Sequence, residues 1–399
     1  MKRVLHLGVG LGLTAFSLGC FGQAKAAPEN LAQKALTLEQ QGNNAEAEES
    51  WRAVLKAHPT SPAPYAHIGL LEARQGRFKE AVPFYRKALE MDPKIPGVRL
   101  DLGLALFKSG QLKEAIPEFK LLLRGAPADS QEELRLTILI GMAHYGLAEY
   151  AEAAPYLKQA AARDRQNLPL LLALAHSYLW SKQFKYVLDV YHQILELNPD
   201  SAEADMLAGE ALDEMKDNEG STKMFRAAVK ADPMEPNVHF GLGYLLWTQK
   251  QYPEAAREFQ AELANDPNHA QSMLYLADTD IQTNQIAAAE PLLEKVVQLN
   301  PSLPLTYLDL GIVYTEAGRN EDALRQLNKA AKLMPDDVNV HWRLGRLYRA
   351  IGKKEEAKAE FAKASTLNKA ADEALFKKIA NGNAHPPQAQ TAPPAPADK

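Results

Sequence analysis

Prolines recur along this chain at a fixed interval, and this periodicity constrains the fold more than any other feature of the sequence. Within each of two groups, every proline follows the previous one by 34 residues. The first group is Pro59, Pro93 and Pro127, and the second is Pro199, Pro233, Pro267, Pro301 and Pro335. Proline ends a helix because it lacks an amide hydrogen and clashes with the preceding turn. A 34-residue unit that ends in proline therefore predicts a repeated pair of helices.

Small residues keep the same interval. One small position in each unit is occupied by Gly69, Gly103, Gly141, Ala175, Gly209, Gly243, Ala277, Gly311 and Gly345. A second is occupied by Ala47, Ala81, Ala115, Ala153, Ala255, Ala289, Ala323 and Ala357, each followed four residues later by a large apolar residue. This spacing places the small and the large residue on one helical face, where a neighbouring side chain can fit. Between the helices, five glycines are predicted to adopt the left-handed conformation that ends a helix. They are Gly42, Gly76, Gly110, Gly318 and Gly352.

This pattern resembles the tetratricopeptide repeat, in which a bulky residue, Leu-Gly, Tyr, an A-x3-F step and Pro follow one another. Tyr307, Leu310-Gly311, Tyr314, Ala323, Leu327 and Pro335 match that order. The resemblance implies an all-α, right-handed α-solenoid of about ten helix-turn-helix repeats. We place the repeats at 28–61, 62–95, 96–129, 134–167, 168–201, 202–235, 236–269, 270–303, 304–337 and 338–371.

Two segments depart from the regular repeat. Four extra residues, Ser130-Gln131-Glu132-Glu133, precede the fourth repeat and have the pattern of a capping box, so its first helix is expected to start a turn early. After the tenth repeat, residues 372–381 are predicted to form a C-terminal capping helix, which an open stack of repeats needs at its end. Residues 382–399 are rich in Pro and Ala and are expected to be a disordered tail.

The first 26 residues have the layout of a secretory signal peptide. A short basic start is followed by a mostly apolar run and by Ala24-Lys25-Ala26, a typical cleavage pattern. Cys20, the only cysteine, follows Ser17-Leu18-Gly19, which resembles a bacterial lipobox with Ser17 in place of the usual aliphatic residue. Both readings predict export from a bacterial cell. The protein is then either released into the periplasm or tethered as a lipoprotein through an acylated Cys20, facing the periplasm.

Composition and motifs exclude several functions. The net charge of −5 argues against nucleic acid as a partner, because phosphate binding needs a positive field. A single cysteine rules out an intrachain disulfide and a zinc site built from thiolates. The sequence contains no HExxH pair, no G-x-S-x-G motif and no Walker loop. We therefore predict that the protein is not an enzyme and has no cofactor, no metal and no small-molecule substrate.

The resemblance also indicates where a partner would bind, since it places the first helix of each repeat on the concave side of the solenoid. Positions 2, 5, 9 and 12 of that helix share one face, because successive residues are about 100° apart. The predicted peptide-binding groove consists of Ile138, Met142, Tyr145, Leu172, His176, Leu179, Trp180, Glu210, Asp213, Asn237, Phe240, Tyr244, Trp247, Arg346 and Arg349. Most are large apolar residues expected to face solvent, and exposed apolar surface marks recognition. The alternative is that neighbouring repeats or the tail cover them.

Acidic and basic residues of this predicted groove lie in different repeats. Glu203, Glu210 and Asp213 make the sixth repeat acidic, which suits a basic segment of a partner or simply a solvated helix. Arg343, Arg346 and Arg349 make the tenth repeat basic, which suits carboxylate or phosphate groups or a soluble end of the stack.

The sequence thus predicts a non-catalytic protein–protein interaction scaffold or adaptor of the bacterial cell envelope that binds protein or peptide segments. Two alternatives stay open. One is an accessory protein of exopolysaccharide biosynthesis or export that contacts glycan or a synthase, and the other is a structural spacer without a specific groove ligand. If the groove binds a partner, replacing Tyr244 and Trp247 by alanine is expected to abolish its capture and leave thermal unfolding almost unchanged.

Overall fold

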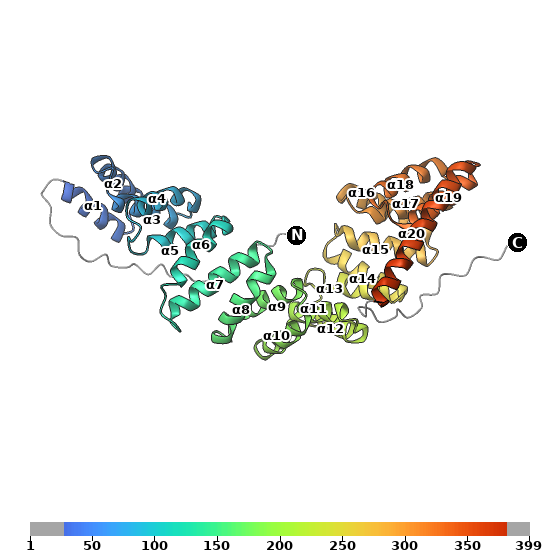
Figure 1. Ribbon diagram of the computed structural model, residues 1–399, viewed down its shortest axis with the longest axis horizontal. Helices are drawn as coiled ribbons and strands as arrows, with labels where there is room; N and C mark the ends of the chain where they lie inside the picture. The colour runs from blue at the N-terminus through green and yellow to red at the C-terminus, as the bar shows by residue number, and fades with distance from the viewer. Residues whose placement is uncertain (1–27, 381–399) are drawn as a thin grey trace. The chain divides into compact units, whose positions relative to one another are not determined.

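A computed structural model describes residues 28–380, which form twenty helices and no strand. The helices follow one another in ten pairs (Figure 1), so the expectation of an all-α repeat solenoid is confirmed. The predicted signal peptide, including Cys20, and the predicted tail 382–399 lie outside the described residues. Within residues 28–380, no helix combines the length and the apolar character needed to cross a membrane.

The chain folds as two compact units, which divide between Met224 and Phe225. Unit 1 contains α1 (Pro28–Gln40), α2 (Asn44–Ala57), α3 (Pro62–Arg74), α4 (Phe78–Met91), α5 (Val98–Lys108), α6 (Leu112–Leu123), α7 (Gln131–Gly146), α8 (Tyr150–Arg163), α9 (Leu168–Trp180), α10 (Phe184–Leu197) and α11 (Ala202–Glu214). The division falls inside α12 (Asn218–Ala231). Unit 2 contains α13 (Val238–Thr248), α14 (Tyr252–Asn265), α15 (Ala270–Gln282), α16 (Ile286–Leu299), α17 (Pro304–Glu316), α18 (Asn320–Leu333), α19 (Val338–Ala350) and α20 (Lys354–Ala380).

The odd-numbered helices are the first helices of the repeats, and they contact one another within each unit. In unit 1, α7 contacts α9, and α9 contacts α11. In unit 2, α13, α15, α17 and α19 are linked in the same way. The helices α7, α9 and α11 of unit 1 and the helices α13, α15, α17 and α19 of unit 2 thus form a layer of first helices in each unit, which we call the odd-helix layer and which carries the predicted groove residues.

Glycine allows the two helices of a repeat to approach each other closely. A Cβ atom added at Gly69 would lie 2.8 Å from the ring of Tyr85, and one added at Gly311 would lie 2.5 Å from the side chain of Leu327. Tyr85 and Leu327 are both buried. The small position of the first helix is thus the space that the large residue of the second helix fills.

Each of the ten turns between paired helices contains one residue in the left-handed conformation. The five predicted glycines have φ values from 72° to 81°, which confirms their role. The other five turns place non-glycine residues at the same point of the repeat, with φ from 59° to 67°: Ala148, Lys182, Lys216, Lys250 and Asn284. The repeat therefore imposes this conformation whether or not glycine is present.

The predicted early start of the fourth repeat is confirmed. The Ser130 hydroxyl oxygen accepts a hydrogen bond from the Glu133 backbone N–H at 3.0 Å, and α7 begins at Gln131. The Glu133 carboxylate accepts a second one from the backbone N–H of Asp129 at 2.6 Å.

The C-terminal end differs from the expectation of a separate capping helix at 372–381. The described part of this segment continues α20, which runs without a break from Lys354 to Ala380. The reason is local, because α20 contains neither Gly nor Pro that would end it.

Candidate functional site

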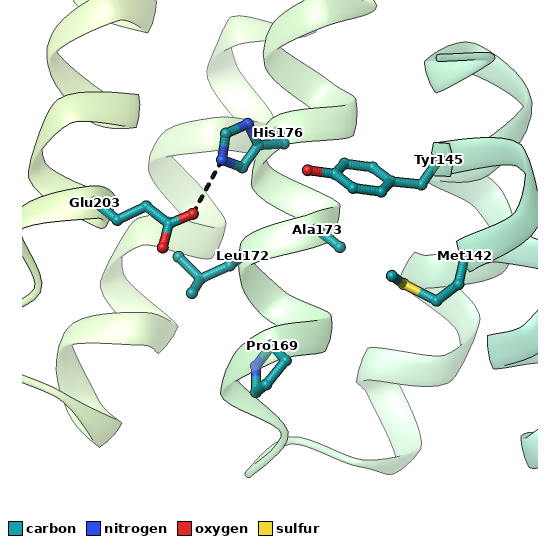
Figure 2. Close-up of a pocket in the computed structure, with 7 residues that line it drawn as sticks. All are labelled: Met142, Tyr145, Pro169, Leu172, Ala173, His176 and Glu203. Carbon is teal, nitrogen blue, oxygen red and sulfur yellow. Dashed lines mark hydrogen bonds and ion pairs between the residues drawn. The ribbon is translucent and has the colours of Figure 1, made fainter. Parts of the chain in front are cut away.

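Unit 1 has a pocket on its odd-helix layer, formed by α7, α9 and α11 (Figure 2). It is lined by Met142, Tyr145, Pro169, Leu172, Ala173, His176 and Glu203. Figure 2 shows Met142 and Tyr145 pointing from α7 toward α9, with Glu203 reaching in from α11. Two of these residues, Pro169 and Ala173, were not predicted from the sequence. Pro169 occupies position 2 of its repeat, so the pattern used for the groove already pointed to it, whereas nothing in the sequence singled out Ala173.

A polar pair closes one side of this pocket. The Nε2 atom of His176 and the Oε1 atom of Glu203 are 3.2 Å apart, and both side chains are partly exposed. The Tyr145 ring meets the His176 ring edge-on, with 6.2 Å between centroids. Burial raises the pKa of Tyr145 to about 12, so its hydroxyl stays protonated and able to donate a hydrogen bond. The pocket thus combines apolar walls with an acid at its rim.

Aromatic rings continue from the pocket to the start of α8 and the end of α9. Tyr150 contacts Tyr145, with centroids 5.8 Å apart, and stacks on Trp180, with centroids 6.2 Å apart. Trp180 is 61% exposed, although it is the largest apolar side chain of α9. An exposed tryptophan supported from behind by another ring is typical of a recognition surface.

One predicted groove residue of unit 1 was placed wrongly. Leu179 was expected to face solvent, but it is 7% exposed and belongs to the core around α8, α9 and α10. The helix explains this, because α9 contacts α7, α8, α10 and α11 and leaves only a narrow stripe open. Ile138 is half-buried and packs against the same core.

The acids of α11 lie near this pocket. Glu210 and Asp213 are half-buried. Burial raises the pKa of Glu210, the charges of Asp213 and Glu214 raise it further, and His176 acts in the opposite direction. The acids of α11 thus lie close enough together to disfavour one another's charged forms.

In unit 2, two of the predicted residues are held by internal contacts. Asn237 precedes α13 in the left-handed conformation, and its backbone N–H donates to Glu262 at 3.0 Å. Phe240 is half-buried among rings that include Tyr244 and Tyr275. Both residues therefore contribute to the local fold.

Tyr244 and Trp247 differ from each other in their surroundings. Tyr244 is 37% exposed, whereas the half-buried indole of Trp247 donates a 2.6 Å hydrogen bond to Asp278. Replacing Trp247 by alanine would remove the donor of a buried carboxylate, which is costly. The structure therefore leads us to expect that the double alanine variant lowers thermal stability, and Tyr244 alone is the better probe of binding.

Of the basic residues predicted on α19, Arg346 and Arg349 are exposed and Arg343 is half-buried. The Arg346 guanidinium lies 4.8 Å from the centroid of the Trp342 ring, and that of Arg349 lies 5.7 Å from the ring of Phe361. Across residues 28–380, no group of three or more His, Cys, Asp or Glu side chains is arranged to hold a metal ion.

Comparison with protein families finds one type of repeat in three stretches of the chain, residues 33–132, 214–304 and 313–370. Models described as tetratricopeptide repeat match residues 33–96, 72–132, 214–270, 240–304 and 338–370, and a model described as TPR repeat matches 313–352. Together the matches cover well over half of the sequence.

Curated relatives match over short stretches. BBSome complex member BBS4 of Bos taurus is 26% identical over 121 residues, which are 30% of this chain and 23% of that protein. Tetratricopeptide repeat protein 8 of Caenorhabditis elegans is 24% identical over 145 residues, which are 35% of this chain and 29% of that protein. The chain thus spans less than a third of either relative.

Solved structures of other proteins are also similar to this chain, with sequence identities of 19% and 20% for two of them. The Pseudomonas aeruginosa pilF structure is 19% identical with a TM-score of 0.45, and covers 50% of this chain and 90% of its own. The structure of YrrB, described as a TPR protein with an unusual peptide-binding site, is 20% identical with a TM-score of 0.39. That match covers 47% of this chain and 97% of YrrB.

Proposed function

This chain belongs to the tetratricopeptide-repeat family, and on that premise we propose that it is a non-catalytic adaptor whose unit 1 binds an extended peptide segment. The family membership itself makes the chain a protein–protein interaction scaffold. The proposal adds the place of binding, which is the pocket of α7, α9 and α11, and the kind of segment that binds there.

The pocket in Figure 2 is the observation that carries this proposal. Its apolar lining offers a small contact surface for one apolar side chain of a partner, and the exposed Trp180 beside it offers a flat surface for a second. Glu203 lines the pocket and Glu210 lies near its His176, and these acids favour a basic residue next to the apolar one. The expected partner is therefore a segment in which apolar and basic residues alternate.

Site-specific photo-crosslinking in cells tests this proposal. A crosslinking residue replaces Trp180, and a matched control replaces Tyr186 on α10, an aromatic residue that is 46% exposed on a second helix of a repeat. We expect one dominant partner from position 180 and none from position 186. Equal, diffuse products from both positions would contradict the proposal and favour a structural spacer.

We also propose that the adaptor acts in the bacterial cell envelope. Support comes from the signal-peptide pattern of residues 1–26 and the lipobox-like sequence before Cys20. Deletion of residues 2–26 is expected to leave the protein in the cytoplasm, as measured by cell fractionation. Unchanged export of the deletion variant would contradict the proposal. In the same assay, Cys20→Ser moves the protein from the membrane to the soluble periplasm if Cys20 is acylated, and changes nothing if it is not.

A further inference from the structure

Unit 2 contains two buried carboxylates and one guanidinium on its odd-helix layer. Asp278 lies on α15, Asp309 on α17 and Arg343 on α19. Asp278 is 5% exposed, and both of its oxygens accept hydrogen bonds, from the Trp247 indole at 2.6 Å and from the Gln282 amide at 3.3 Å. These two donors fix the position of the Asp278 carboxylate.

Asp309 is in the opposite situation. It is 1% exposed, and its buried Oδ2 atom has no hydrogen-bond partner among residues 28–380. The Nε atom of the half-buried Arg343 is likewise unpartnered within the described chain. Burial raises the pKa of Asp309 well above its usual value, the negative charge of Asp278 raises it further, and Arg343 only partly opposes this. A buried polar group without a partner is costly, so each such group needs an explanation.

This cluster holds two buried acids and one guanidinium. Burial also raises the pKa of Asp278, so the site disfavours two negative charges and favours a proton on one of its acids. Arg346 and Glu316 also act on Arg343, but both are exposed and therefore screened by solvent. A bound cation would stabilise both carboxylates in their charged form and so replace that proton.

Three aromatic rings lie beside the two carboxylates. Tyr244 stacks on Trp247 with centroids 6.0 Å apart, and both meet the Tyr275 ring edge-on at 5.2 Å and 5.1 Å. Burial raises the pKa of Tyr275 to about 12, and the nearby charges of Tyr244, Asp278 and Asp309 contribute to the shift. Tyr244 is the exposed member of this set. Aromatic ring faces attract cations, so the rings and the carboxylates favour the same kind of ligand.

We propose that Tyr244, Trp247, Tyr275, Asp278 and Asp309 form a binding site for a basic side chain, arginine in preference to lysine, of an extended peptide segment. The planar guanidinium of arginine stacks on an aromatic ring and donates hydrogen bonds to carboxylates at the same time. A carboxylate ligand would add a third acid to the two already present, and a neutral sugar would supply no positive charge to stabilise them in their charged form. This inference extends the proposed function to unit 2 and rests on it for the peptide nature of the partner.

Fluorine NMR on the full chain tests the site directly. The chain has four tryptophans, so labelling with 5-fluorotryptophan gives four signals, and the Trp247 signal is assigned with a Trp247→Phe variant. The probes are acetyl-Gly-Arg-Gly-amide and the same peptide with citrulline, which has the shape of arginine without its charge. We expect the arginine peptide to shift the Trp247 signal to saturation and the citrulline peptide to bind at least about tenfold more weakly.

Two matched variants complete the test. Asp309→Asn keeps the shape of the side chain and removes its charge, and we expect it to weaken binding of the arginine peptide by at least about tenfold. Glu355→Gln removes one exposed acid from α20 in the same unit and is expected to leave binding unchanged. Thermal unfolding of both variants checks that they are folded. Equal binding of the two peptides, or full binding by Asp309→Asn, would overturn the inference. A Trp247 shift caused instead by a neutral oligosaccharide such as cellotetraose would also overturn it.

Two measurements together test the unit 2 site and the unit 1 pocket independently of each other. Arginine binding and crosslinking from position 180 are both measured on the chain with an unsubstituted Asp309. If this chain does not bind the arginine peptide while the crosslinked partner persists, the unit 2 site is refuted and the proposed function stands. If arginine binding is present without a crosslinked partner, the unit 1 proposal fails alone.

Discussion

At the scale of single residues, the turn between paired helices requires one residue in the left-handed conformation, which glycine adopts most easily. Lys250 has a φ of 60°, a conformation that costs a residue with a Cβ roughly 1 kcal/mol or more. Lys250→Gly is therefore expected to raise the free energy of unfolding by about 1 kcal/mol, as measured by denaturant unfolding. The reverse change, Gly352→Lys, should lower it by a similar amount, because Gly352 has a φ of 81° and no atom within 4 Å of an added Cβ. Opposite signs to these would show that side-chain contacts decide this position.

A second residue links stability to pH. Asp101 is half-buried on α5, and burial raises its pKa to about 6, although Arg135 and Arg74 act to lower it. Between pH 4 and pH 6 the folded state then binds more protons than the unfolded state, so stability falls as pH rises through this range. Asp101→Asn should therefore stabilise the protein by roughly 1–3 kcal/mol at pH 7.5 and have little effect near pH 4. Thermal unfolding at both pH values measures this, with the exposed Asp189→Asn as control. An equal effect at both pH values would exclude the titration of Asp101 as the cause.

At the scale of the helix pair, packing and helix propensity make opposite predictions for glycine. Propensity alone favours Ala over Gly in a helix by about 1 kcal/mol. At Gly311, however, an added Cβ would lie 2.5 Å from the buried Leu327 side chain. Gly311→Ala is therefore expected to lower the free energy of unfolding by roughly 1–3 kcal/mol, because it overpacks the contact. Calorimetry gives the sign directly, and a stabilised variant would mean that the two helices can move apart at little cost.

The helix pairs were predictable from the sequence because local rules set them. Proline spacing, the small positions and the capping box at Ser130 each describe a contact within a few dozen residues of one repeat. Ser221, where alanine is usual, shows the limit of such rules. It is fully buried, and its hydroxyl donates a 2.8 Å hydrogen bond to the backbone carbonyl of Gly209, so a polar residue fits an apolar position.

At the scale of the whole molecule, the groove was less predictable than the helices that carry it. Position within a repeat selects the face of a helix, and it found most of the pocket in Figure 2. It could not show that Leu179 is buried, because that depends on how closely neighbouring repeats flank α9. Position within a repeat also did not single out Asp309. Its raised pKa depends on burial and on the nearby charges of Asp278 on α15 and Arg343 on α19, and its Oδ2 atom has no hydrogen-bond partner among the described residues.

The stacking of repeats also predicts which helices lose stability when one repeat is destabilised by a substitution. Each repeat contacts mainly its neighbours, so stability is expected to behave as a sum of repeats and of the interfaces between them. Phe259→Ala removes a fully buried ring from α14, a change that costs roughly 3–5 kcal/mol in a core. Hydrogen exchange followed by mass spectrometry should then show the largest loss of protection in α13 to α15, a smaller loss in the adjoining helices and none in α1 to α4. Tyr186→Ala, at an exposed position, should leave the whole pattern unchanged. A uniform loss of protection over all ten repeats would show instead that the chain unfolds as one cooperative body, in which binding at one repeat would stabilise every other.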